Sequence, residues 1–264
     1  MIKNLLRFAS VVAVGLGLAS AAAAQDFQKS YTIGAGGQVR IANVSGDIII
    51  KGYNGTSILI SGIKQGPDRD LVEVEDLSTA NGVDLRVRYQ ECRSCNASIR
   101  FEVQVPNAMK YNFDRISTAS GDIEASSVMG DLTIKTASGD VRLSDVNGTI
   151  NASSASGDVR VGNAVGAVRA STASGDVDVE ITRLEGAKRL EFSSASGDVV
   201  VRLPGSLDAE VEMSTHSGEL ETDFPIQVRE ERHGSGRSAR GRLGDGSISL
   251  SIRTASGDVR LKRL

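Results

Sequence analysis

The stretch that decides the fold is Lys135–Val161, which reads KTASGDVRLSDVNGTINASSASGDVRV. It contains two copies of Ser-Gly-Asp, whose glycines are Gly139 and Gly157, and Gly148 stands midway between them. The signature recurs at the same spacing in both directions, at Ser120–Asp122, Ser138–Asp140, Ser156–Asp158 and Ser174–Asp176. Glycine therefore recurs at half the spacing of the full Ser-Gly-Asp signature. This regular spacing indicates an internal repeat.

Apolar residues keep the same period as the glycines. Ala or Val stands two positions before each repeat glycine from Gly121 to Gly175, and Ile, Leu, Val or Ala stands two and four positions after it. Polar residues such as Arg142 and Arg160 occupy the positions between. This alternation predicts strands with one buried face, and the glycines predict turns, because glycine adopts positive φ without strain.

These units predict an all-β fold, a right-handed parallel β-solenoid with two strands in each coil of about 18 residues. Each strand would pair with its equivalent in the next coil at a distance of about 4.8 Å, so that Val141, Val159 and Val177 lie over one another. An antiparallel β-sandwich or roll is the alternative, because short strand and turn units also suit hairpins. Hairpins do not explain why the full signature returns at every second repeat glycine rather than at every one.

The repeat continues on both sides with insertions. Gly197, Gly218 and Gly257 follow in that order, and Gly37 and Gly46 precede the regular region. We interpret residues 25–264 as one solenoid domain, with irregular coils at about 62–112 and a long loop at about 223–247. Lys262 and Arg263 follow the last glycine copy, so we expect their charges to protect the end of the stack and keep the protein monomeric.

Residues 1–24 predict a cleaved signal peptide of the Sec type. Lys3 and Arg7 precede an apolar run, and Ala22 and Ala24 fit cleavage before Gln25. A membrane anchor is the competing interpretation, but the run is short and rich in Ala and Gly. No later stretch predicts a transmembrane segment, so we expect a periplasmic, secreted or cell-surface protein.

Composition excludes several classes of protein. The whole chain has 30 basic and 33 acidic residues and a net charge of −3, which gives no basic excess for binding nucleic acid. An apolar content of 40% is too high for a disordered chain. With 4% aromatic residues, the core must be built from aliphatic side chains.

The copies Thr-Ala-Ser-Gly-Asp-Val and Ser-Ala-Ser-Gly-Asp-Val behind a signal peptide resemble the bacterial "putative adhesin" β-strand-repeat family of unknown function. The resemblance covers about Val39–Leu264. It implies a β-solenoid protein of the cell envelope and carries no catalytic residues to this chain.

The aspartates of the repeat are weak calcium candidates: Asp122, Asp140, Asp158, Asp176 and Asp198. They would stack along one edge, as acids do in calcium-binding β-rolls. Those rolls take acids from both turns of a coil, whereas the second turns here carry Asp131, Thr149 and Ala167, and Ca²⁺ takes six to eight oxygen ligands. We therefore interpret the aspartates as turn-capping residues and predict no metal site, cofactor or catalytic residue.

Cys92 and Cys95 are the two cysteines, and an exported chain would oxidise them to a local disulfide. A redox site would need a helix after the first cysteine, whereas Ile99–Val105 predicts a strand. A zinc site would need four ligands, and the chain adds only His216 and His233 to the two cysteines.

The long loop carries several basic residues among Gly and Ser: Arg229, Arg232, His233, Arg237, Arg240 and Arg242. They indicate either an arm for an anionic envelope partner or a solvated loop diluted by nearby acids.

The sequence thus favours a non-catalytic, structural or adhesin-like scaffold of the envelope. The alternatives are a polysaccharide-binding or polysaccharide-processing protein, and an element of envelope-stress sensing or assembly. Candidate partners are envelope polysaccharide, lipid headgroups or an envelope protein.

Overall fold

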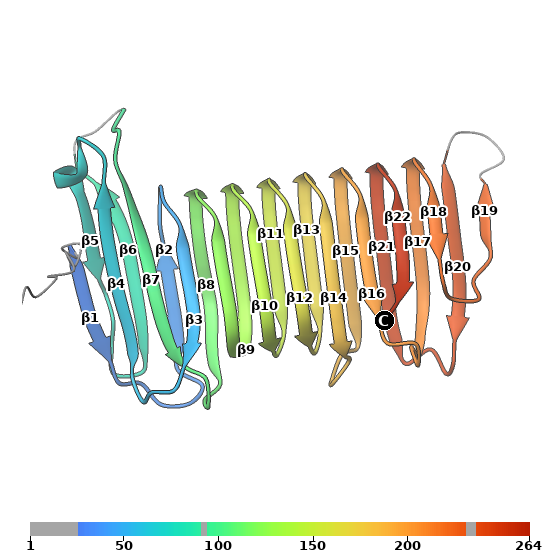
Figure 1. Ribbon diagram of the computed structural model, residues 1–264, viewed down its shortest axis with the longest axis horizontal. Coiled ribbons are helices and arrows are strands. Elements are labelled where there is room, and N and C mark those ends of the chain that lie inside the picture. The colour runs from blue at the N-terminus through green and yellow to red at the C-terminus, as the bar shows by residue number, and fades with distance from the viewer. Residues whose placement is uncertain (1–25, 91–93, 231–235) are drawn as a thin grey trace, which may run out of the picture.

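The computed structural model describes residues 26–90, 94–230 and 236–264, which form two facing β-sheets along one long axis (Figure 1). The strands of sheet A are β1 (Phe27–Tyr31), β3 (Ile48–Tyr53), β4 (Ile58–Gln65), β7 (Ser98–Pro106), β10 (Val141–Asn147), β12 (Val159–Val165), β14 (Val177–Arg183), β16 (Val199–Leu203), β18 (Leu220–Thr222) and β22 (Val259–Arg263).

The strands of sheet B are β2 (Gln38–Ala42), β5 (Val72–Asp76), β6 (Gly82–Tyr89), β8 (Tyr111–Ser120), β11 (Ile150–Ser156), β13 (Val168–Ser174), β15 (Arg189–Ser196), β17 (Ala209–Ser217), β19 (Val228–Glu230), β20 (Arg237–Leu243) and β21 (Ile248–Ser256). The long strand β9 (Ile123–Ser138) contributes its first half to sheet A and its second half to sheet B. One short 3-10 helix spans Arg69–Leu71. None of the described residues forms a helix of the length and apolarity that crossing a bilayer requires.

Equivalent residues of successive repeats lie over one another, as the spacing of the Ser-Gly-Asp copies predicts. Val141 pairs in parallel with Val159, and Val159 pairs with Val177. All three side chains are fully buried between the sheets, where each contributes about 1.5–3 kcal/mol. The parallel β-solenoid is therefore confirmed, whereas its handedness stays a prediction.

Each coil consists of a strand in sheet B, a corner with the Ser-Gly-Asp signature or a variant of it, and a strand in sheet A. The corner glycines have positive φ, +135° at Gly157 for example. Successive coils also approach closely at this corner, because a Cβ added to Gly157 would lie 2.1 Å from the carbonyl oxygen of Gly139. Glycine is required at the corner both by backbone conformation and by space.

The coils do not stack in the order of the sequence, contrary to our expectation for Gly218 and Gly257. The last coil, β21 and β22, lies between the coil β15–β16 and the coil β17–β18. At the other end, β2 and β3 lie between β6–β7 and β8–β9 in the same way. The period does not determine this order, because the coils present similar apolar side chains to their neighbours.

Antiparallel strands close both ends of the stack, so the antiparallel alternative holds only there. At one end β4 pairs with β1 and β7, and β5 pairs with β6. At the other end β20 pairs with β17 and β19, within the segment expected as a long loop.

The expected role of Lys262 and Arg263 as guards of the end is wrong. Both residues belong to β22, which lies inside the stack between β16 and β18. Closure of that end falls instead to the antiparallel strands β19 and β20.

A cluster that we call the N-terminal latch joins the two sheets where β1 and β5 form their edges. The Tyr31 hydroxyl donates a hydrogen bond of 2.9 Å to Oδ2 of Asp76, and the Lys29 ammonium forms an ion pair with the same oxygen. Burial by itself would raise the pKa of Asp76, but hydrogen bonds from Lys29, Ser78 and Tyr31 outweigh it and hold that pKa well below its usual range. Burial and the neighbouring Asp76 raise the pKa of Tyr31.

Replacing the corner glycine, Gly157→Ala, is expected to lower the free energy of unfolding by at least ~2 kcal/mol, because the new methyl group would meet a backbone oxygen at a strained φ. The matched control is Gly162→Ala within β12, where the nearest atom to the new Cβ lies at 4.0 Å. This control should be neutral or slightly stabilising. Urea unfolding of both variants measures the difference, and equal stabilities would contradict the close-approach argument.

The N-terminal latch predicts a loss of stability in acid. Because the pKa of Asp76 is lower in the folded chain than in the unfolded chain, its stabilisation is complete above about pH 4 and is lost as the pH falls toward the folded value. Thermal unfolding followed from pH 7 to pH 3 should show a smaller decrease in Tm for Asp76→Asn than for the parent chain. The exposed Asp70→Asn serves as the control and should follow the parent curve.

Candidate functional site

The repeat aspartates form a continuous hydrogen-bonded ladder along the corner. Oδ1 of Asp140 accepts the backbone N–H of Asp158 at 2.8 Å, and Oδ1 of Asp158 accepts that of Asp176 at 2.8 Å. The acceptors in stack order are Asp47, Asp122, Asp140, Asp158, Asp176, Asp198 and Asp258, and the last donor is the N–H of Glu219. Each aspartate thus binds the next coil rather than its own turn, which corrects our turn-capping interpretation.

Arginines on sheet A engage the second oxygen of several of these aspartates. Arg142 lies 2.6 Å from Oδ2 of Asp122 and 2.5 Å from Oδ2 of Asp140, so one guanidinium joins two coils. Burial alone would raise the pKa of Asp122, but the N–H of Asp140 and the Arg142 guanidinium lower it overall. Arg260 joins Asp198 and Asp258 in the same way.

The weak calcium candidates therefore already have partners within the chain. A cation at Asp122, Asp140, Asp158, Asp176 or Asp198 would have to compete with the backbone N–H bonded to each carboxylate. Over residues 26–90, 94–230 and 236–264, no group of three or more His, Cys, Asp or Glu side chains is arranged to hold a metal ion.

A second ladder, which the sequence analysis missed, is made of buried hydroxyl groups. Thr172 stands three positions before Gly175 and donates a hydrogen bond of 2.8 Å to the carbonyl oxygen of Gly157 in the preceding coil. The equivalent donors are Thr118, Thr136, Ser154, Ser194, Thr254 and Thr215. The signal was present in the sequence, because Thr or Ser occupies this position in each of these copies.

The cysteines and the basic segment are only partly within the described residues. Cys92 lies outside them, so its disulfide with Cys95 stays a prediction. Arg232 and His233 also lie outside them, and Arg229 belongs to β19.

Three arginines of this basic segment lie on β20. Arg240 is 2.5 Å from Glu212, Arg237 is 3.6 Å from Glu219, and Arg242 donates to the carbonyl oxygen of Asp245. Arg237 and Arg240 therefore fasten the closing strand to the stack, and Arg242 contacts the turn that follows β20, instead of forming a free arm.

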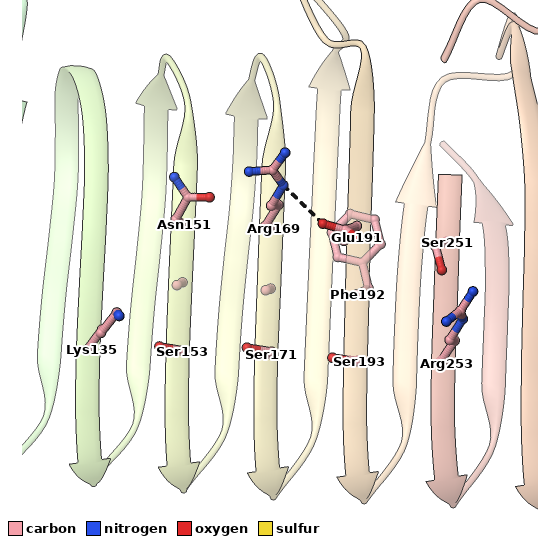
Figure 2. A pocket seen from close by; sticks show the side chains of 12 residues that line it. Lys135, Asn151, Ser153, Arg169, Ser171, Glu191, Phe192, Ser193, Ser251 and Arg253 are labelled. Atoms are coloured by element: carbon pink, nitrogen blue, oxygen red, sulfur yellow. Dashed lines mark ion pairs between the residues drawn. The ribbon is translucent and has the colours of Figure 1, made fainter. Parts of the chain in front are cut away.

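The outer surface of sheet B carries a shallow hollow of about 410 Å³, which we call the sheet B hollow (Figure 2). Its polar lining comes from β9, β11, β13, β15 and β21: Lys135, Asn151, Ser153, Arg169, Ser171, Glu191, Ser193, Ser251 and Arg253. The serines Ser153, Ser171 and Ser193 are register partners, so they form a row with one hydroxyl in each coil.

Charged groups border this row of serines. Nε of Arg169 lies 3.1 Å from Oε2 of Glu191, and Arg253 donates to Glu212 at 2.7 Å. The hydrogen bond from Arg189 is the main cause that lowers the pKa of Glu191. Lys135 stands at the opposite end of the row from Arg253 (Figure 2). The hollow therefore offers regularly spaced hydroxyl groups between cationic side chains.

The lining of the sheet B hollow offers hydrogen-bond donors and acceptors to a ligand. Its single carboxylate, Glu191, forms ion pairs with Arg169 and Arg189, and the lining includes neither histidine nor cysteine. No serine of this lining has a histidine beside it that could act as a base and activate it.

Removing one step of the aspartate ladder tests its contribution to stability. Asp158→Ala is expected to cost about 1–2 kcal/mol, because the N–H of Asp176 loses its acceptor and Arg160 loses an ion pair. Asp158→Asn keeps an oxygen acceptor and should cost less than half as much. Urea unfolding distinguishes the two variants, and equal losses would mean that the ion pair rather than the ladder matters.

Three solved structures resemble this chain over 90% of its length. They are a putative cell adhesion protein from Clostridium sporogenes (12% identity, 99% of that chain covered, TM-score 0.40), a putative adhesin from Bacteroides fragilis (13%, 96%, 0.43) and a putative adhesin from Parabacteroides distasonis (9%, 96%, 0.34). The sequence matches no curated protein.

The Toastrack DUF4097 profile matches residues 29–262, which include all of β2 to β21 and most of β1 and β22. The chain therefore belongs to the Toastrack DUF4097 family.

Proposed function

We propose that this protein is an exported, non-catalytic scaffold of the cell envelope that presents the outer surface of sheet B to a polar envelope partner. The observation that carries the proposal is the sheet B hollow, in which the same outward position supplies a hydroxyl group from successive coils. The regular coils of the Toastrack domain supply a rigid frame for such a row, and the predicted signal peptide supports export.

An extended polysaccharide is the partner class that fits this surface best. Sugar units repeat along an extended glycan as coils repeat along the solenoid, with about 4.8 Å between strands. The hydroxyl groups of Ser153, Ser171 and Ser193 both donate and accept hydrogen bonds, while Lys135 and Arg169 add donors that suit acidic sugars. Lipid headgroups and envelope proteins are the competing partners.

Sheet A makes a weaker binding surface beside the Ser-Gly-Asp corner, because its arginines there already join acidic side chains of neighbouring coils. Arg142, Arg160 and Arg260 each contact acidic side chains of two coils. A ligand would have to displace these pairs. In the sheet B hollow, Arg169 pairs with one acid, Glu191, and Lys135 makes no ion pair within the described residues.

Binding to purified acidic envelope polysaccharide, measured by isothermal titration calorimetry, tests the proposal. The double variant Lys135→Ser with Arg169→Ser should bind roughly tenfold more weakly, because two exposed charge contacts of about 0.2–1 kcal/mol each are lost. The matched control on sheet A, Lys51→Ser with Arg160→Ser, removes the same charge and should bind like the parent chain. Equal weakening by both pairs would indicate a charge effect without a site, and binding to anionic vesicles alone would indicate lipid.

Two further measurements address the alternatives. Polysaccharide that shortens during incubation would contradict a non-catalytic role and favour the processing alternative. Fractionation of cells should find the mature chain, cleaved before Gln25, in the envelope or the medium. A stress-sensing or assembly role would be favoured if the protein were recovered with an envelope protein and bound no glycan.

A further inference from the structure

The C-terminal coil, Ile248–Arg263, occupies a position that the chain reaches only by returning into its own stack. After β16, the next coil in the sequence, β17–β18, does not pair with β15–β16. It lies one strand position further along each sheet, and β20 pairs with the outer edge of β17. The chain then crosses the start of β17, and β21 and β22 occupy the strand positions left between the coils β15–β16 and β17–β18. We call these places the slot.

The slot offers the kinds of contact found in the regular, parallel part of the stack. Leu250 lies between Leu190 and Val211, and Ile252 lies between Phe192 and Met213. The corner ladder also runs through it, because Asp258 donates its N–H to Asp198 at 2.8 Å and accepts the N–H of Glu219 at 2.9 Å. Nothing in these contacts depends on whether the inserted coil belongs to the same chain.

A short crossing connects β20 to the C-terminal coil. It consists of Gly244–Ser247, and its two glycines have positive φ, +56° at Gly244 and +69° at Gly246. Because β20 and β21 lie on opposite sides of β17, this crossing is the segment that must change conformation when the coil leaves the slot.

One carboxylate holds this crossing in place. Oδ1 of Asp208, immediately before β17, accepts the N–H of Gly246 at 2.6 Å and that of Ser247 at 3.2 Å. The backbone oxygen of Asp208 accepts the Ser247 hydroxyl at 3.3 Å and the N–H of Ile248 at 3.2 Å. Asp208 thus fixes the direction in which the chain turns back toward the slot.

We propose that the C-terminal coil is exchangeable between two copies of this chain, with Gly244–Ser247 as the hinge and Asp208 as the clamp that favours the closed monomer. In the exchanged form, β21 and β22 of each copy fill the slot of the other. Every contact of the coil is kept, and only the hinge changes. Exchange of an identical element is a low-cost route to dimers, and short hinge loops promote it.

Cysteine cross-linking detects exchange directly. Ser214 on β17 and Arg253 on β21 are register partners on the outer surface of sheet B, at a separation that a disulfide can span. Chains carrying Ser214→Cys are refolded at high concentration with chains carrying Arg253→Cys, oxidised and separated on a non-reducing gel. A covalent pair of the two chains is expected, since the two positions meet across chains only after exchange.

The matched control replaces Ser214→Cys with Ser144→Cys, an exposed position on sheet A that is not a partner of Arg253. The control mixture should give no cross-linked pair. Equal cross-linking in both mixtures, or folded protein without any cross-link between positions 214 and 253, would overturn the proposal.

The clamp is tested by the dimer fraction in light-scattering chromatography after refolding. Asp208→Ala should raise the exchanged fraction roughly fivefold, the factor expected when one net hydrogen bond no longer favours the closed hinge. Asp245→Ala, a change of the same size within the hinge at an exposed side chain, should leave the fraction unchanged. Equal fractions for the two variants would show that Asp208 is not the clamp. If Asp208→Ala fails to fold, the cross-linking result in the otherwise unchanged chain decides the proposal.

Discussion

A close approach repeats along the stack from Gly121 onward, where each glycine of the Ser-Gly-Asp corner faces the carbonyl oxygen of the corner glycine in the preceding coil. A Cβ would lie 2.0 Å from that oxygen at Gly139 and 2.4 Å at Gly175, so no other residue fits. This approach sets the spacing at which backbone hydrogen bonds form between coils, such as Gly157 N–H to the Ser174 oxygen at 2.9 Å. The hydroxyl ladder, the aspartate ladder and the buried apolar columns all depend on that spacing.

Stacking identical coils places identical charges next to one another, which costs stability unless each charge finds a partner. Five corner aspartates reduce this cost by dividing their two oxygens, one for the backbone of the next coil and one for an arginine: Asp122, Asp140, Asp158, Asp198 and Asp258. Arg142 and Arg260 each lie between two such carboxylates, so ion pairs join carboxylates of neighbouring coils that would otherwise repel one another. The outer surface of sheet B differs in its hollow, which presents a row of serine hydroxyl groups and Lys135, a side chain without an ion pair among the described residues.

The sequence predicted the regular part of the fold because its period fixes which residues share a column. Val141, Val159 and Val177 could be placed from spacing alone. The order of the terminal coils could not, because the spacing places a corner at Gly218 and at Gly257 without specifying which of the two lies beside Gly197. The part of the sheet B hollow that β21 contributes was unpredictable for the same reason. Arg253 borders Ser193 only because β21 returns to pair with β15, a contact between segments that lie far apart along the chain.

The insertion of a coil at each end has a consequence for how such a molecule could change length in evolution. Each end consists of an inserted coil and antiparallel strands that cover the last parallel strand. An additional unit at either end would disrupt these antiparallel strands. The central units contact only neighbours like themselves. Duplication or deletion of one two-strand unit between Gly121 and Gly175 would lengthen or shorten the molecule while both ends stay unchanged. The width of the outer surface would then change in steps of one strand.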